Sequence, residues 1–184
     1  MSYKPFALGV IVGRFQTLHA GHEYMIRTAL SLCQEVGIFV GSSQESGTAV
    51  NPFSYKTRES LLRLLFGNQV RICPLPDIGV GNNATWGEYV LKNVETQFDR
   101  YPDLLISGKE MRRISWFDGI EGLRISELYI PKTIDISASQ MRQFLIQDDR
   151  ESWQRYTNRA LWGQYDMLRD TVLASCSCQE TASM

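Results

Sequence analysis

The alternation of short apolar runs with longer segments of helical spacing constrains the fold of this chain more than any other feature. Residues 6–12 form an apolar run between Pro5 and Gly13, which predicts a buried strand. Further strands are predicted at 38–40, 70–73, 104–107 and 128–130, and helices at 22–36, 57–66, 85–98 and 138–174, with breaks near Asp148 and Gly163. This alternation predicts an α/β fold, with a doubly wound, five-stranded parallel sheet and C-terminal helices.

The length and composition are those of one globular domain. The chain has 184 residues, of which 43% are hydrophobic and 21% charged, close to the globular average. We therefore expect one domain over residues 1–174, with a helical extension from about 138. The remaining residues, 175–184, are small and polar and predict a disordered tail.

Charge and cysteine content exclude several classes of protein. The 19 basic and 20 acidic residues leave a net charge of −1, so no global positive field favours a nucleic-acid partner. The first apolar run is too short to span a membrane. Cys33 and Cys73 lie in apolar surroundings typical of small core residues, which favours a reducing, cytoplasmic location.

The loops after the first four strands are the expected binding region. In parallel α/β sheets, ligands bind outside the carboxyl ends of the strands. In this chain those ends lead into residues 13–22, 41–55, 74–86 and 107–113.

Both histidines of the chain lie in the first of these loops. His19 and His22 surround Gly21 where the first helix should begin. Free N–H groups at a helix start attract anions, a glycine there lets a phosphate approach the main chain, and imidazoles can donate to phosphate oxygens. The alternative is structural, with one histidine capping the helix and the other packing in the loop.

These residues resemble a known superfamily. The run GRF followed by H-x-G-H after a first strand is similar to that of the Rossmann-like nucleotidyltransferases. A second motif of that superfamily, I-S-x-S/T-x-x-R, matches residues 136–142 at the expected place, after the fifth strand. Two motifs in the right order are far more specific than either alone.

Further residues narrow the resemblance. Residues 13–16 (GRFQ), 41–46 (GSSQES) and 51–53 (NPF) resemble the archaeal-type nicotinamide mononucleotide adenylyltransferases. The same type forms the first domain of bifunctional proteins that carry a Nudix hydrolase, and we expect no Nudix activity from this chain. The resemblance implies transfer of AMP from ATP to the mononucleotide, without a covalent intermediate, forming NAD and pyrophosphate. It leaves a homo-oligomer open, because relatives often assemble.

The resemblance also assigns roles to individual residues. It implies a catalytic set of His19, His22 and Arg142, and an ATP site of Gly13, Arg14, Phe15, Gly21, Gly108, Lys109, Ser137 and Ser139. Ser137 and Ser139 either donate to the phosphates or cap the helix that follows. Mg²⁺ is expected on the triphosphate, held by phosphate and water, because we find no carboxylate cluster for it.

The family's mononucleotide contacts correspond to Asp77, Asn83 and Trp86, with Asn82 an equal candidate for the asparagine. A pyridinium ring stacks well on an indole. The alternative makes Trp86 a core residue of the helix that follows.

One departure lies after the fourth strand. The family usually continues Ser-Gly-Asn or Ser-Ser-Asp, whereas this chain has Lys109 after Ser107 and Gly108. Lys109, Arg112 and Arg113 are either phosphate contacts or solvated loop residues. Two other functions remain open: a nucleotidyltransferase for another phosphorylated acceptor, and a non-catalytic nucleotide sensor.

Overall fold

The computed structural model describes residues 3–79, 83–108, 114–118 and 120–180. In chain order its elements are β1 (Phe6–Gly13), α1 (Ala20–Leu32), β2 (Cys33–Gly41), α2 (Tyr55–Phe66), β3 (Arg71–Leu75), α3 (Asn83–Phe98), β4 (Leu104–Ser107), the 3₁₀ helix η1 (Ile114–Phe117), β5 (Ser126–Tyr129), α4 (Ala138–Ile146), α5 (Arg150–Arg155), the 3₁₀ helix η2 (Arg159–Gln164) and α6 (Tyr165–Glu180).

The predicted parallel sheet is confirmed. Its five strands lie in the order β3-β2-β1-β4-β5, and every pair of neighbours is parallel. The central strand β1 pairs with β2 on one side (Phe6↔Cys33) and with β4 on the other (Gly9↔Leu104). The strand order reverses direction at β1, so a crevice is expected outside the carboxyl ends of β1 and β4.

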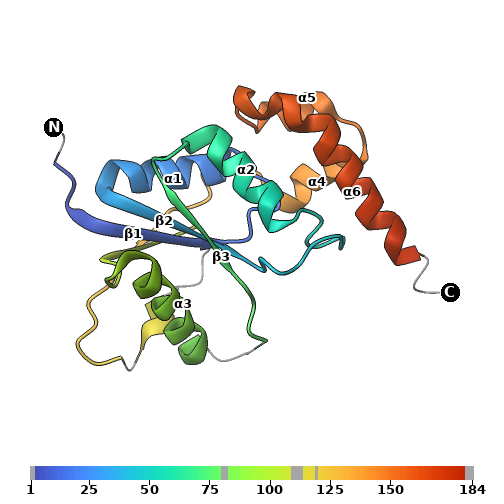
Figure 1. Cartoon of the computed structure of the whole chain (residues 1–184). Helices are drawn as coiled ribbons and strands as arrows, with labels where there is room; N and C mark the ends of the chain where they lie inside the picture. Colours follow the sequence, from blue (N-terminus) through green and yellow to red (C-terminus); the bar gives the residue numbers. More distant parts are fainter. Residues whose placement is uncertain (1–2, 80–82, 109–113, 119, 181–184) are drawn as a thin grey trace.

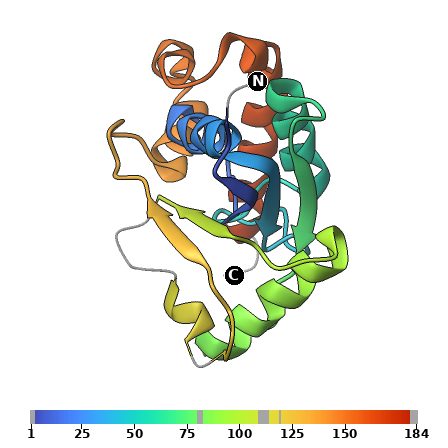
Figure 2. The same ribbon diagram turned by 90° about the vertical axis from the view of Figure 1, so that its left-hand side faces the viewer.

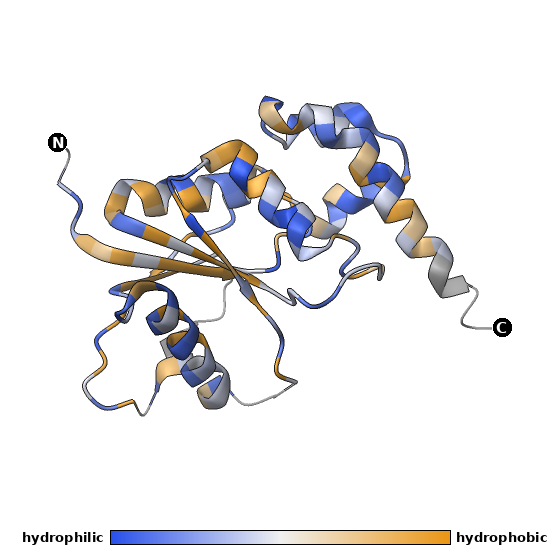
Figure 3. Cartoon of the chain, in the orientation of Figure 1, coloured by the Kyte–Doolittle hydropathy of each residue, from blue (hydrophilic) through white to orange (hydrophobic). Residues whose placement is uncertain are grey.

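Alternate residues of the strands pack into two separate hydrophobic cores, one on each face of the sheet. Ile11 and Ile38 face the core that α1, α2 and the C-terminal helices cover, whereas Val10 and Phe39 face the core beneath α3 and η1. Figure 1 shows α1 and α2 on one side of the sheet and α3 on the other, and Figure 2 shows η1 beside α3. The strands are apolar along most of their length, while the helices show hydrophilic stretches (Figure 3). The fold is therefore doubly wound, as expected.

The boundary between the first helix and the second strand differs from the prediction. The spacing of Leu32 and Val36 predicts a helix to residue 36, but α1 ends at Leu32 and β2 begins at Cys33. Pairing with β1 from Phe6↔Cys33 onward explains the difference, because the same apolar spacing fits a strand that is buried at Cys33 and again from Val36.

The sequence predicts that the third strand ends at residue 73, but β3 continues through Pro74 to Leu75. Pro74 pairs with Val40 inside β3, which is an edge strand of the sheet. A proline is tolerated there because one side of an edge strand needs no ladder hydrogen bonds.

The C-terminal helices are present and extend further than predicted. The predicted breaks near Asp148 and Gly163 coincide with the turn before α5 and with η2. The disordered tail predicted from residue 175 is wrong in its first part, because α6 continues to Glu180, with Ser175 buried and Cys176 packed against the core. None of the described helices is long and apolar enough to cross a membrane.

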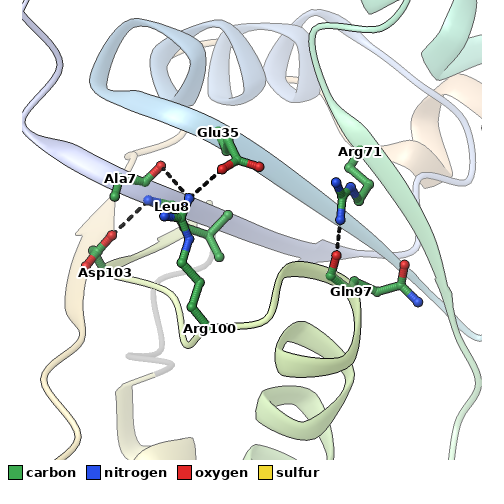
Figure 4. A network of polar contacts seen from close by, with 7 residues as sticks. All are labelled: Ala7, Leu8, Glu35, Arg71, Gln97, Arg100 and Asp103. Carbon is green, nitrogen blue, oxygen red and sulfur yellow. Dashed lines mark hydrogen bonds and ion pairs between the residues drawn. The ribbon is translucent and has the colours of Figure 1, made fainter.

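Polar contacts tie the amino ends of the strands to the end of α3. Asp103 accepts a hydrogen bond from the Leu8 amide at 2.8 Å, and Arg100 donates to Glu35 at 2.6 Å (Figure 4). On β3, Arg71 donates to the Gln97 carbonyl and lies over the Phe98 ring. This end of the sheet is therefore occupied by structural contacts, and the opposite end is left for a ligand.

Candidate active site

A cleft of about 640 Å³ opens at the carboxyl ends of β1 and β4. Its lining comes from the β1–α1 loop, the β2 end, β4, α3, η1, the β5–α4 loop and the start of α4. The predicted site residues in this lining are Gly13, Arg14, Phe15, His19, Gly21, His22, Asp77, Trp86, Gly108, Ser137, Ser139 and Arg142. Residues predicted from four separate loops thus meet in one cavity.

The two histidines stack on each other at the floor of the cleft. Their ring centroids lie 3.8 Å apart at an interplanar angle of 29°, and the Phe15 ring lies 5.0 Å from that of His22. His19 is also the N-cap of α1, since its Nδ1 accepts the Gly21 amide at 3.2 Å. The capping role and the location in the cleft therefore coexist in one residue.

Both imidazoles are held neutral in the free protein. Burial, and next the Lys132 cation, lower the pKa of His19 to about 4. Burial, and next the neighbouring His19, lower the pKa of His22 well below its usual value, and the Thr17 backbone only partly opposes this. Because Nδ1 of His19 accepts a hydrogen bond, its proton lies on Nε2 and is free to donate to a ligand.

The start of α1 offers fewer free amides than the sequence suggested. The Ala20 amide donates to the Tyr156 carbonyl at 2.8 Å, and the Gly21 amide to His19. A Cβ on Gly21 would lie 3.1 Å from atoms of the His19 ring. This glycine therefore makes room for the imidazole that covers the helix start, and side chains rather than these two amides face an anion.

Arg142 reaches the first loop from the other end of the chain. Its Nη1 donates to the Gln16 carbonyl at 2.6 Å and its Nη2 to the Ser139 hydroxyl at 3.2 Å. Ser137 caps α4 by accepting the Gln140 amide, so of the two serines Ser137 is the cap and Ser139 orients the arginine. Together with Arg14 and Lys132, Arg142 gives this part of the cleft a positive charge.

The other part of the cleft is aromatic. Trp86 is half-buried in α3, lines the cleft and meets Trp116 edge to face, with ring centroids 6.1 Å apart. It therefore serves both the core beneath α3 and the cavity. Asp77 lines the same cavity, and its backbone amide donates to Gln44. Asn83 is exposed at the start of α3 and lies outside the cleft lining.

Several predicted residues fall outside the described part of the chain: Asn82, Lys109, Arg112 and Arg113. Other residues of the site were missed. The Gln16 side chain donates from Nε2 to the Phe53 carbonyl and accepts the Phe53 amide at Oε1. Lys132 lines the cleft on the β5–α4 loop. Arg58 is fully buried behind the cleft wall. Gln16 belongs to the GRFQ run, whereas nothing in the sequence distinguishes Lys132 and Arg58 from solvated side chains.

Among the described residues, no group of three or more His, Cys, Asp or Glu side chains is placed to hold a metal ion. Asp77 is the acidic residue of the described cleft lining, and one carboxylate suits a metal that arrives already bound to phosphates.

Comparisons with known proteins identify chains that are similar to this one. Curated nicotinamide-nucleotide adenylyltransferases are similar to the chain, with 37% identity over 122 residues for the protein of Aeropyrum pernix and 42% over 87 residues for that of Pyrococcus horikoshii. These alignments cover 62% and 45% of this chain, and 67% and 46% of the relatives. The chain therefore matches about half to two thirds of the length of these relatives.

The fold also matches solved structures. A bifunctional NMN adenylyltransferase/ADP ribose pyrophosphatase from Francisella tularensis, complexed with AMP and a manganese ion, superimposes with a TM-score of 0.72 at 23% identity. The match covers 90% of this chain and 48% of that protein. The model of the cytidylyltransferase-like family matches residues 10–144, which include both motifs and most of the cleft. The chain is therefore a member of the cytidylyltransferase-like family.

Proposed function

We propose that the protein transfers AMP from ATP to nicotinamide mononucleotide, forming NAD and pyrophosphate. The observation that carries this proposal is one cleft with two chemically different ends. The first end holds the stacked His19–His22 pair beside Arg14 and Arg142, and the second presents the Trp86 indole. The first suits a triphosphate and the second a flat pyridinium ring. The curated relatives carry the matching name.

The reaction needs positioning and charge stabilisation rather than a protein nucleophile. A 5′-phosphate oxygen of the mononucleotide attacks the α-phosphorus of ATP in line, the bond from that phosphorus to the bridging oxygen breaks, and pyrophosphate leaves. His19 donates from Nε2 to a phosphate oxygen, while Arg142, oriented by Ser139, holds the β- and γ-phosphates. No proton transfer to the protein is required.

A divalent cation enters as part of the substrate. We propose Mg²⁺ bound to the ATP phosphates, which would offset charge that Arg14, Lys132 and Arg142 do not neutralise. The structural relative crystallised with AMP and manganese supports the use of a divalent ion. The buried thiols Cys33 and Cys73 fit a protein of the reducing cytoplasm, where both substrates would be supplied.

The test is pyrophosphate release by the full chain with Mg-ATP and nicotinamide mononucleotide. Parallel reactions contain nicotinate mononucleotide, CTP with glycerol 3-phosphate, or no acceptor. The matched variant is His19→Asn, because asparagine caps a helix as well as histidine does in this position but has no imidazole. We expect turnover with the pyridine mononucleotide, lowered by ~10²–10³-fold in the variant, as for the loss of one transition-state donor.

Other results would overturn the proposal. Turnover with CTP and glycerol 3-phosphate alone would identify another acceptor and make Trp86 a packing residue. ATP binding without turnover in any mixture would identify a nucleotide sensor. Full activity in His19→Asn would remove His19 from the mechanism.

A further inference from the structure

Among the residues that the structure describes, the most unusual buried side chain is the arginine behind the cleft. Arg58 is 0% exposed, although it lies near the start of α2, where the helix dipole disfavours a cation. Burying a guanidinium is costly unless its donors are satisfied. Its described hydrogen bonds all run to main-chain carbonyls, so a role in organising backbone is more consistent with the contacts than a role in an ion pair.

These carbonyls belong to three different segments. Nη1 donates to the carbonyls of Arg14 at 2.9 Å and Gly41 at 2.7 Å, and Nη2 to that of Ser42 at 3.0 Å. Nε donates to the Ser54 carbonyl at 3.3 Å, at the N-cap of α2. A single planar group thus joins the β1–α1 loop, the end of β2 and the start of α2.

Two of the joined segments hold a residue in left-handed backbone. Phe15 has φ of 52° and Ser42 has φ of 48°, and neither is a glycine. Such residues are disfavoured and persist only where their surroundings hold them. The carbonyls of Arg14 and Gly41 belong to the peptide groups that immediately precede Phe15 and Ser42, so Arg58 contacts both unusual backbone positions directly.

The direction of these peptide groups affects the cleft. In a trans peptide the C=O and N–H point in opposite directions. With both carbonyls turned toward Arg58, the amides of Phe15 and Ser42 point away from it. The Ser42 amide faces Leu75 of the neighbouring strand β3, so the Phe15 amide is the one that can face a ligand, and Phe15 lines the cleft. The same contact fixes the main chain of Arg14, from which its exposed side chain extends at the phosphate end of the cleft.

We propose that Arg58 is a positioning residue that holds Phe15 and Ser42 in left-handed backbone and thereby presents Arg14 and the Phe15 main-chain amide to the triphosphate. The inference deepens the proposed function and rests on it for the identity of the ligand. Burial, and next the Arg14 cation, lower the pKa of Arg58, and the nearby carboxylates of Asp77 and Glu45 only partly oppose this. The carbonyl dipoles supply the remaining stabilisation of the charge.

The test first weakens the hydrogen bonds of residue 58, and then removes the backbone strain at residue 42 that those hydrogen bonds hold in place. Arg58→Lys keeps the charge but cannot reach three segments with one planar group. We expect its kcat/KM to fall ~10- to 100-fold, with weaker ATP binding by calorimetry, as for a small misplacement of binding groups. Adding Ser42→Gly removes the free-energy cost of left-handed backbone at residue 42. The double variant should therefore have a kcat/KM about five- to thirtyfold higher than that of Arg58→Lys alone.

Two matched controls accompany these variants. Ser43→Gly, at a neighbour with no positive φ, should give no recovery in the Arg58→Lys background. Arg63→Lys changes an exposed arginine on the same helix, which contacts Glu59 and the Gly67 carbonyl, and should leave kcat/KM unchanged. Thermal unfolding of every variant separates recovered activity from recovered stability.

The proposal is overturned if Arg58→Lys binds ATP as the wild type does, or if Ser42→Gly gives no more recovery than Ser43→Gly. Should Arg58→Lys fail to fold, Ser42→Val in the wild-type background replaces it, because a β-branched residue disfavours φ near 48°. Unchanged ATP affinity in Ser42→Val would then refute the idea. Calorimetry measures the ATP affinity of every variant even if the protein forms no NAD. A failure of the proposed function can therefore be distinguished from a failure of this inference.

Discussion

At the scale of single residues, His19 combines a structural role in the fold with a place in the lining of the cleft. Its Nδ1 caps α1 and its ring stacks on that of His22, so burial stabilises the neutral form. The pKa of His19 is lowered from 6.5 to about 4, and that of His22 is lowered too. Between these pH values the unfolded chain binds more protons than the folded one, so stability is complete above pH 6.5 and falls as the pH drops toward 4.

This linkage gives a measurable prediction. The melting temperature of the wild type should decrease steadily from pH 7 to pH 4.5, and the decrease should be shallower in His19→Asn, which keeps the cap without a titrating ring. His22 should preserve part of the slope in that variant. Thermal unfolding followed by circular dichroism across this range provides the measurement. Equal slopes for the two proteins would show that His19 does not titrate in this way.

The sequence predicts the location of the histidine pair, because both residues lie in a short motif at one strand end, where topology alone fixes the position. Arg58 is different. In the run TRESLLRLLF it is one of two arginines of an amphipathic helix, and Arg63, the other, is in fact exposed. Which of them is buried depends on carbonyls of residues 14, 41 and 42, which only the folded chain brings together. Local pattern carries no information on such contacts.

At the scale of elements, the sequence predicts both ends of strand β4 correctly, whereas the boundary between α1 and β2 depends on pairing with β1, which lies elsewhere in the chain.

The docking of η1 on α3 was not predictable, because it depends on one close contact. A Cβ on Gly87 would lie 1.7 Å from the Trp116 carbonyl oxygen. The bare backbone at Gly87 therefore lets η1 approach, and this contact places Trp116 beside Trp86 at the aromatic end of the cleft.

Replacing this glycine should therefore damage both the packing and the cleft. Alanine favours the helix over glycine by about 1 kcal/mol. We nevertheless expect Gly87→Ala to lower the free energy of unfolding by about 1–3 kcal/mol, because η1 must move to make room for the methyl group. The KM for the mononucleotide should rise more than the KM for ATP, since Trp116 lies at the aromatic end. Urea unfolding and initial rates measure the two effects.

Gly163→Ala is the matched control for that experiment, because a Cβ there meets no atom within 4 Å. It should leave both the stability and the two KM values near those of the wild type. If Gly87→Ala proves as stable as Gly163→Ala, the close contact between α3 and η1 does not constrain the fold.

At the scale of the whole molecule, the C-terminal helices complete the site instead of forming a separate appendage. They share one core with β1, β2, α1 and α2, and they supply Arg142. They also close over the start of α1, where Tyr156 accepts the Ala20 amide and the Asn158 side-chain amide donates to Glu23 at 3.0 Å. Hydrogen bonds thereby join the C-terminal helices to α1, the helix that begins at the histidine motif. We therefore expect the stability of these helices to affect the order of the residues in the cleft.

Asn158→Asp tests this connection with little other change. Aspartate still caps η2, as Asn158 does for the Ala160 amide, but it places a carboxylate against Glu23. Loss of the hydrogen bond and repulsion between the two acids should cost about 1 kcal/mol, and hence lower the melting temperature by ~2–4 °C at pH 7. Adding Glu23→Gln should restore most of the loss, because an amide can again pair with residue 158. If the two substitutions are additive in thermal unfolding, the contact does not couple the C-terminal helices to α1.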